Sequence, residues 1–286
     1  MRVKIFSEYG ALNSAPVFEA FRKSLSRFDM TEVKEDYDVA VIWSILWKGR
    51  MASNKPVWDY CQANNKPVIV VEVGGIKRGT TWKIGINGIN REAYFGEAGN
   101  PDDRAKKFGL ELKPWQTGRD IIICCQNPDS HQWRNMPPAS TWVYNTVEAI
   151  RKYTAKPIVI RDHPRARLDW IEVEFINVTR QTPIKIDGSY DDFDFDFHNA
   201  HAVVNWSSNP ATQAVIGGVP VFVGPESLAW DVGNHDLTTI NNPIKPDRIQ
   251  WLNDLAYTEW TLEEIQNGEP LLQLLPKLQE LVLAKK

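Results

Sequence analysis

Short apolar runs alternate with amphipathic stretches along the first part of the chain. Runs with the length of buried strands occupy residues 3–6, 38–43 and 66–72, and stretches with apolar side chains at helical spacing occupy residues 16–28 and 52–64. Strands that alternate with helices are typical of a parallel sheet with crossover helices. The pattern therefore predicts a Rossmann-like α/β domain at the start of the chain.

A second series of apolar runs follows residues 114–118, whose Pro and Gly mark a domain junction. Residues 101–113 are charged and predict a short helix before it. Thr261 and Glu264 have the spacing of a capping box. We predict an α/β fold with two Rossmann-like domains, residues 1–115 and 116–260, followed by closing helices in residues 261–286. The predicted strands of the second part are 120–126, 156–161, 184–186, 202–206 and 219–223, and its predicted helices are 142–153, 251–268 and 271–283.

Residues 202–223 form the most informative unit of this pattern. The apolar run 202–206 leads into a polar turn, Ser207-Ser208-Asn209, and Pro210 suits the first position of a helix, with Asn209 as its N-cap. Gly217 and Gly218 end that helix before the next strand. A helix start with free N–H groups and hydroxyls suits a phosphate, although the same pattern also describes a capped helix without a ligand.

The sequence NWSSNPATQAVIGGVPVFV in this unit resembles the donor-side motif of GT-B-fold glycosyltransferases. The resemblance covers residues 161–226 and is strongest to capsule-type sugar transferases and to phage enzymes that glycosylate DNA bases. It implies two Rossmann-like domains that face each other across a cleft, with the closing helices crossing back to the first domain. It also implies a UDP-sugar as co-substrate.

The resemblance assigns donor-binding roles at the expected strand ends of the second domain. Arg161 and His163, in the sequence RDHPR, match a turn that faces the donor, where Arg offers a fork of donors to a phosphate. Both could instead be surface charge at a strand end. The remaining donor-binding candidates are Ser207, Ser208, Asn209, Gln213 and Glu226.

Sugar transfer removes a proton from the acceptor hydroxyl and therefore needs a general base. The resemblance to GT-B enzymes implies that this base lies in the first domain. Glu8 and Glu72 follow predicted strands there, and only one of them can be the base; we favour Glu72. Residues 74–95 are rich in Gly, Lys and Arg and break the α/β alternation. We interpret them as an acceptor-binding loop with Lys77, Arg78, Trp82 and Lys83, or alternatively as a β-hairpin.

Composition narrows the function classes only in part. The chain has 286 residues and a net charge of −3, with an excess of Lys and Arg in residues 1–113 and of Asp and Glu in the remainder. A basic first part suits a nucleic-acid acceptor, although such an imbalance is also common without one. Its three cysteines, without a zinc-like spacing, and the lack of a signal peptide or a long apolar run predict a cytoplasmic protein, in the host cytoplasm if the protein is viral.

These observations together predict a glycosyltransferase. We expect a sugar, glucose by preference, to pass from a UDP-sugar to a hydroxymethylated pyrimidine in DNA. A glycan acceptor, a nucleotide-sugar epimerase or hydrolase, and a non-catalytic DNA- or glycan-binding module are the alternatives. No protein partner is inferred. Asp192, Asp194 and Asp196 form D-x-D patterns of the kind that hold a metal elsewhere, but we expect metal-independent chemistry and solvated carboxylates here.

Overall fold

The structure is a computed structural model that describes residues 1–168, 175–189 and 192–284. Packing divides the chain into two compact units. Unit 1 combines Met1–Arg104 with the residues from Asp254 onward, and unit 2 is Ala105–Asn253. Unit 2 is therefore an insertion in the sequence of unit 1, and α3 (Asp103–Lys107) and α6 (Ile249–Ala256) span the two points where the chain passes between them.

The sheet of unit 1 has the strand order β11-β5-β4-β3-β1-β2. Strands β4, β3, β1 and β2 are parallel, whereas β5 is antiparallel to both of its neighbours. The expected parallel α/β core is thus extended by a mixed edge. The strands are β1 (Arg2–Ile5), β2 (Thr31–Glu32), β3 (Val39–Trp43), β4 (Val68–Val73), β5 (Trp82–Ile86) and β11 (Glu259–Trp260).

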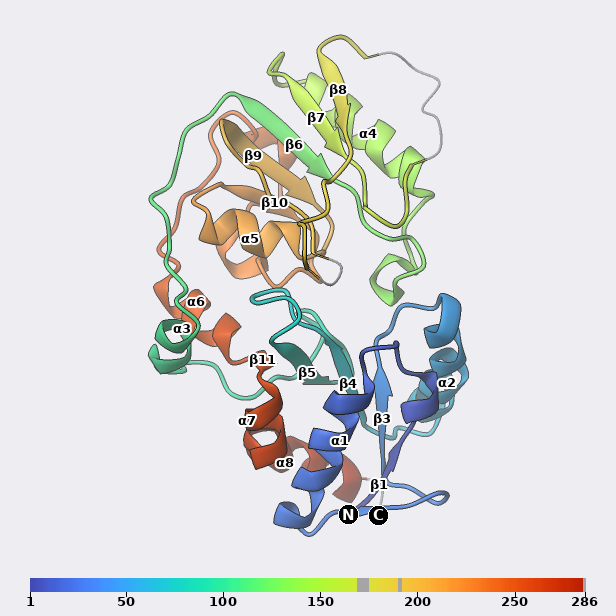
Figure 1. Ribbon diagram of the computed structural model, residues 1–286. Helices are drawn as coiled ribbons and strands as arrows, with labels where there is room; N and C mark the ends of the chain where they lie inside the picture. Colours follow the sequence, from blue (N-terminus) through green and yellow to red (C-terminus); the bar gives the residue numbers. More distant parts are fainter. Residues whose placement is uncertain (169–174, 190–191, 285–286) are drawn as a thin grey trace. The chain divides into compact units, whose positions relative to one another are not determined.

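Helices cover both faces of this sheet (Figure 1). One face packs against α1 (Ala15–Ser24), α7 (Leu262–Asn267) and α8 (Glu269–Leu283), and the other packs against α2 (Asn54–Ala63). Phe18 and Phe21 of α1 are fully buried in the first of these cores. Each such side chain contributes about 1.5–3 kcal/mol through burial. Short 3-10 turns lie at Ser7–Tyr9, Leu25–Phe28 and Gly49–Ser53.

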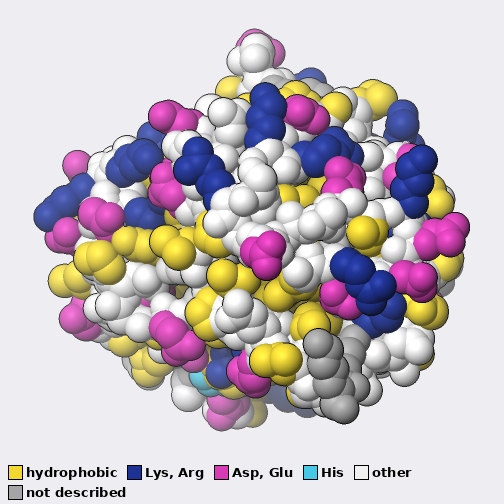
Figure 2. All heavy atoms as spheres, turned by 90° about the horizontal axis from the view of Figure 1, so that it is seen from below, with side chains coloured by type: hydrophobic (Ala, Val, Ile, Leu, Met, Phe, Trp, Pro, Cys, Tyr) yellow, Lys and Arg dark blue, Asp and Glu magenta, His cyan; other side chains and the backbone are white. Residues whose placement is uncertain are grey.

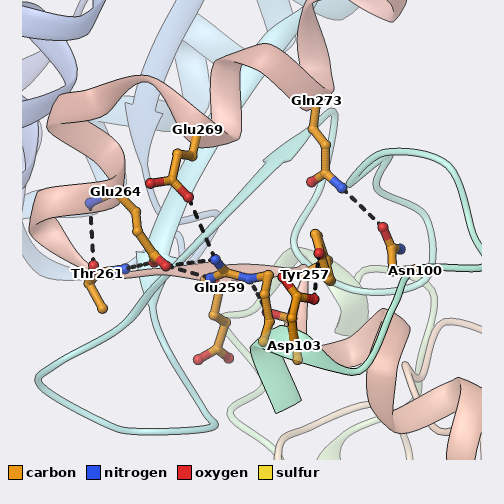
Figure 3. A network of polar contacts seen from close by, with 10 residues as sticks. Asn100, Asp103, Tyr257, Glu259, Thr261, Glu264, Glu269 and Gln273 are labelled. Atoms are coloured by element: carbon orange, nitrogen blue, oxygen red, sulfur yellow. Dashed lines mark hydrogen bonds and ion pairs between the residues drawn. The ribbon is translucent and has the colours of Figure 1, made fainter. Parts of the chain in front are cut away.

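A buried arginine joins the two segments of unit 1. Arg104 donates from Nη1 to Glu264 Oε1 at 2.7 Å and from Nη2 to Glu264 Oε2 at 3.1 Å, and Glu269 lies 3.9 Å from Nη1 (Figure 3). Its guanidinium lies 3.9 Å from the ring centroid of Trp260. Arg104 and Glu264 are 4% and 2% exposed, so each charge has its partner where water cannot screen it.

The sheet of unit 2 is entirely parallel, in the order β10-β9-β6-β7-β8. Helix α4 (Ala139–Arg151) packs on one face and α5 (Pro210–Ile216) on the other (Figure 1). The predicted fold class, α/β with two Rossmann-like units, is confirmed. The strands are β6 (Asp120–Cys124), β7 (Ile158–Arg161), β8 (Val178–Gln181), β9 (Ala200–Asn205) and β10 (Val221–Val223), with 3-10 turns at His131–Trp133, Trp230–Val232 and Leu237–Thr239.

A second stacked arginine holds the ends of unit 2 together. The Arg248 guanidinium lies 3.6 Å from the ring centroid of Trp115, and its Nη2 donates to the carbonyl of Lys113. Trp115 in turn donates from Nε1 to the Pro246 carbonyl at 3.0 Å. Burial of Arg248 lowers the pKa of its guanidinium below the ordinary arginine value. The first and last segments of unit 2 are therefore fixed beside each other.

Three local predictions need correction. Residues 251–268 are not one helix, because Glu259 and Trp260 pair with β5 as strand β11; the predicted capping box of Thr261 and Glu264 is confirmed at the start of α7. Residues 184–186 form only an isolated bridge of Lys185 with Phe193, and the strand beside β7 is β8, which was missed. Residues 74–95 are not a free loop throughout, because they contain β5, which pairs antiparallel with β4; the alternative prediction of a β-hairpin is therefore correct for these two strands.

No helix within residues 1–168, 175–189 and 192–284 combines the length and the apolar character needed to cross a membrane.

Replacement of Arg104 by Met should destabilise unit 1 by about 3–5 kcal/mol, because it leaves the buried Glu264 carboxylate without its counter-charge. Urea unfolding followed by circular dichroism measures the change. Lys55→Met is the control: its ion pair with Asp59 is exposed and should contribute about 0.3–0.5 kcal/mol. Equal losses in the two variants would contradict the assigned role of Arg104.

The stability of the protein should fall when the pH drops below about 6.5. His201, at the start of β9, donates from Nε2 to the Ile240 carbonyl at 2.7 Å, and burial lowers its pKa from 6.5. The unfolded chain then binds the proton more readily than the folded chain, so this contribution is complete above pH 6.5 and is lost as the pH falls through that value. Urea unfolding at pH 7.5 and 5.5 should show a smaller decrease for His201→Gln than for the exposed control His198→Gln; the same decrease in both would rule His201 out.

Candidate functional site

The candidate site is the carboxyl edge of the unit 2 sheet. The chain runs from the central β6 outward to β7 and β8, then returns to the other side of β6 as β9 and β10. The order reverses between β6 and β9, and open α/β sheets bind ligands beyond the carboxyl ends of their strands at such a point. We call the residues that follow these strands the carboxyl-edge site: Gln126, Arg134, Arg161, Asn205, Ser207, Ser208, Asn209 and Glu226.

The polar turn after β9 is held from β6. Ser207 donates from its backbone N and its Oγ to Gln126 Oε1, at 3.0 and 3.1 Å. Asn205 donates from Nδ2 to Ser208 Oγ at 2.7 Å and to the Cys124 carbonyl at 3.1 Å. The turn is therefore fixed at the switch point by side chains of β9 and of the loop after β6.

Helix α5 begins at Pro210, as predicted, but the cap is different. Asn209 has helical backbone angles, and its Oδ1 accepts from Thr212 Oγ1 at 2.9 Å without capping a backbone N–H. Asn209 thus occupies the N-cap position, as predicted, but its side chain bonds to Thr212 and makes no capping bond to the helix backbone. Gln213 is half-buried one turn further along α5.

The strand register lines up three side chains across the sheet. Cys124 of β6 is paired with Arg161 of β7 on one side and with Asn205 of β9 on the other. All three point to the face that α5 covers, and the two outer Cα atoms are about 10 Å apart, twice the strand spacing. Burial raises the pKa of the Cys124 thiol to about 12, against the opposing effect of Arg161, so the cysteine in the middle stays protonated.

Two polar atoms of this row have no partner. Arg161 is 4% exposed and Asn205 is 1% exposed. Within the part of the chain that the structure describes, neither Arg161 Nη1 nor Asn205 Oδ1 has a hydrogen-bond partner, although other atoms of the same side chains do. A buried donor and a buried acceptor without partners are costly, at about 1–3 kcal/mol each. They identify this row as the part of the site that is chemically incomplete.

Loops at the carboxyl edge are also tied to one another. Trp206 donates from Nε1 to the Gln132 carbonyl at 3.0 Å, and Arg134 donates from Nη2 to Glu226 Oε1 at 2.7 Å. Glu226, a predicted donor ligand, is thus paired with an arginine from the loop after β6. Sequence reasoning missed Gln126 and Arg134, although Gln126 ends the predicted strand 120–126 and Arg134 lies in the loop after it, and a position at a strand end is the signal that identified other candidates.

His163 lies two residues beyond Arg161 at the same strand end. Its Nδ1 accepts from the Arg165 backbone N at 3.2 Å within a tight turn to Ala166. Asp162, which lies between Arg161 and His163 in the sequence, is buried and accepts from Arg180 Nη2 at 2.8 Å. The structure therefore brings Arg161 and the Ser207–Asn209 turn to one edge, while His163 serves a local turn beside them.

The two candidate bases differ in how firmly unit 1 holds them. Glu72, near the end of β4, accepts from Ser44 Oγ at 2.5 Å and from the Val73 backbone N at 2.8 Å. Glu8 is exposed on the 3-10 turn after β1. Ser44 has a φ of 63°, an unusual value for serine, so the strand end is shaped to reach Glu72. The geometry gives Glu72 a fixed orientation.

The predicted acceptor-binding loop is mostly a hairpin. Trp82 and Lys83 are 7% and 8% exposed within β5, so the expectation that they lie on a free loop is wrong; β5 pairs on both sides and buries them. Lys83 lies directly opposite Glu72. Lys77 is exposed and Arg78 is half-buried on the turn before β5.

A buried carboxylate shapes that turn. Glu259 of β11 accepts from the Gly75 backbone N at 2.6 Å, from the Ile76 backbone N at 3.0 Å and from Thr81 Oγ1 at 2.7 Å. It is 1% exposed. The sequence could not indicate this role, because residue 259 lies within an expected helix and far from the hairpin along the chain.

The aspartates of the D-x-D pattern bond to the chain itself. Asp192 and Asp196 accept from the backbone N–H groups of Phe193 and His198, at 3.0 and 2.9 Å, and Asp194 pairs with Arg161. Among the described residues, no group of three or more His, Cys, Asp or Glu side chains is placed to hold a metal ion.

No protein-family model matches the sequence, and no curated protein matches it. Among solved structures, the chain is similar to KpsC of Thermosulfurimonas dismutans, a beta Kdo 2,4 transferase, with 13% identity, a TM-score of 0.55 and 90% of each chain covered. A KpsC structure of the same organism, a beta Kdo 2,7 transferase, gives 12% identity and a TM-score of 0.47, with 95% of this chain and 98% of that chain covered. The first similarity establishes a shared fold; neither structure is a phage DNA-base glucosyltransferase.

Proposed function

We propose that the protein is a glycosyltransferase that moves a sugar from a nucleotide-sugar donor to a hydroxyl acceptor. The observation that carries this proposal is the convergence of Arg161, Asn205 and the Ser207–Asn209 turn at the switch point of the unit 2 sheet. A guanidinium and a polar turn there suit a diphosphate. The fold shared with a Kdo transferase supports the same class of reaction.

The reaction assigns a separate role to each unit. The acceptor oxygen bonds to the anomeric carbon, the bond from that carbon to the diphosphate breaks, and the nucleoside diphosphate leaves with the electron pair. Arg161 in unit 2 stabilises the charge on the leaving diphosphate. Glu72 in unit 1, oriented by Ser44, takes the proton from the acceptor hydroxyl. UDP is the nucleotide, and glucose is the first sugar to test.

We propose a saccharide as the acceptor, in place of the DNA acceptor that the sequence suggested. The DNA hypothesis rests on the basic first part of the chain, on the resemblance to phage enzymes and on Lys77, Arg78, Trp82 and Lys83. Of these four side chains, Trp82 and Lys83 are buried in β5. Figure 2 shows one face of the molecule, on which Lys and Arg side chains are interspersed with Asp and Glu. The Kdo transferase of similar fold is consistent with a saccharide acceptor.

A panel of nucleotide sugars, UDP-glucose first, should reveal the activity when it is incubated with saccharides, with hydroxymethylated DNA and with plain DNA. We expect a gain of one sugar mass on a saccharide, measured by mass spectrometry, and loss of that gain in Glu72→Gln. A mass gain on hydroxymethylated DNA alone would establish the DNA acceptor. Donor consumption that is independent of any acceptor would identify a hydrolase or epimerase, and no nucleotide binding would leave a binding module.

Arg161→Ala should weaken UDP binding by about 1–3 kcal/mol, the range for a charge-assisted hydrogen bond. Isothermal titration calorimetry measures the affinity. Arg119→Ala provides the control, because Arg119 is exposed at the opposite, amino end of the strands and pairs only with Asp120 among its described neighbours. Unchanged affinity in Arg161→Ala would remove Arg161 from the donor site.

A further inference from the structure

The stretch of alternating Asp and Phe residues contacts the candidate donor site. Asp194 accepts from Arg161 Nη2 through its Oδ1, at 3.2 Å, and through its backbone carbonyl. The neighbouring Phe195 ring lies 5.8 Å from the guanidinium carbon. Asp194 thus bonds to Arg161, the residue that we propose to bind the donor diphosphate.

Asp194 leaves Arg161 only half satisfied. A guanidinium can donate to two acceptor oxygens in parallel through Nη1 and Nη2, but Nη1 has no partner among the described residues. Both acceptors that Asp194 offers, its Oδ1 and its backbone carbonyl, bond to Nη2, and the same Oδ1 also accepts from the Ile184 backbone N at 2.8 Å. The arginine is therefore held in place with half of its fork unused.

The described residues of the segment that carries Asp194 expose several apolar side chains. Backbone bonds join Ile184 to Asp194 and Ile186 to Asp192, and Ile184 and Ile186 are 69% and 44% exposed. Phe195 is 37% exposed. Segments with few buried apolar contacts open at a low cost in free energy. Removal of Asp194 from Arg161 therefore requires little disruption of the core.

We propose that Asp194 is an internal substitute for a phosphate group of the ligand. In the free protein its carboxylate neutralises the buried Arg161; on binding, a phosphate with two free oxygens replaces it and bonds to both Nη1 and Nη2. Asn205 Oδ1, on the same row, then accepts from a hydroxyl of the ligand. This inference rests on the proposed function, because it specifies how the donor diphosphate enters that site.

Competition of this kind has a measurable consequence. Asp194 and the phosphate cannot both bond to the same guanidinium, and the observed affinity is reduced by the fraction of molecules in which Asp194 occupies it. Because a hydrogen bond to a charged group contributes about 1.5–3 kcal/mol, removal of the Asp194 carboxylate should raise the affinity for a diphosphate about tenfold or more.

Calorimetric titration with inorganic pyrophosphate, and separately with UDP, tests the substitution. Asp194→Ala should bind pyrophosphate at least tenfold more tightly than the wild type. Asp196→Ala is the matched control: it removes the same charge two residues away, where the carboxylate accepts from the His198 backbone N. Arg161→Gln combined with Asp194→Ala should lose the gain. Asp194→Asn, which keeps an acceptor for Ile184, should show a smaller gain and guards against a folding defect in Asp194→Ala.

Hydrogen exchange provides a second measurement in the wild type. Pyrophosphate should accelerate exchange at the Ile184 amide, because that amide loses Asp194 as its acceptor. Equal gains in Asp194→Ala and Asp196→Ala would show a general charge effect and overturn the proposal. Unchanged or weaker binding in Asp194→Ala, or no pyrophosphate binding in any variant, would overturn it as well. Sugar transfer could still occur in those cases, so failure here is distinguishable from failure of the proposed function.

Discussion

The architecture depends on two arginines that stack on tryptophans. Arg104 on Trp260 joins the two sequence segments of unit 1, and Arg248 on Trp115 joins the two ends of unit 2. Each guanidinium also bonds to backbone carbonyls, so the chain segments on both sides of an insertion are fixed to each other. A planar cation suits this position, because its faces stack on rings while its edges donate hydrogen bonds. Each unit can therefore form one continuous sheet although unit 1 is interrupted by about 150 residues of sequence.

A few specific polar contacts also hold the carboxyl-edge site together. Parallel register places Arg161 and Asn205 on either side of Cys124, and the turn after β9 is fixed by Gln126. Strands carry the charged and polar groups, and Asp194, from a segment with exposed apolar side chains, pairs with Arg161 in the free protein. Pairing with Asp194 lowers the free-energy cost of burying the Arg161 charge until a ligand phosphate replaces the carboxylate.

Local patterns predicted most of the fold, because the information for each α/β unit lies in short stretches. The strand, turn and helix around Pro210 could be predicted because Pro, the Gly pair and the apolar runs each act within a few residues. Strand β11 could not be predicted, because Glu259 and Trp260 are extended only through their pairing with β5, about 175 residues earlier in the sequence. Trp82 and Lys83 were misplaced for the same reason. Asn205, Gln126 and Arg134 gained their significance only when register and loops brought them to one edge.

The late position of β11, α7 and α8 in the sequence has a consequence for biosynthesis. Unit 2 is complete before these elements leave the ribosome, whereas unit 1 still lacks Ile265, Leu271 and Leu274 from its core and has an open edge along β5. Unpaired strand edges and uncovered apolar faces attract other chains during synthesis. During synthesis, unit 2 can therefore fold before unit 1, whose core is completed only when β11, α7 and α8 become available.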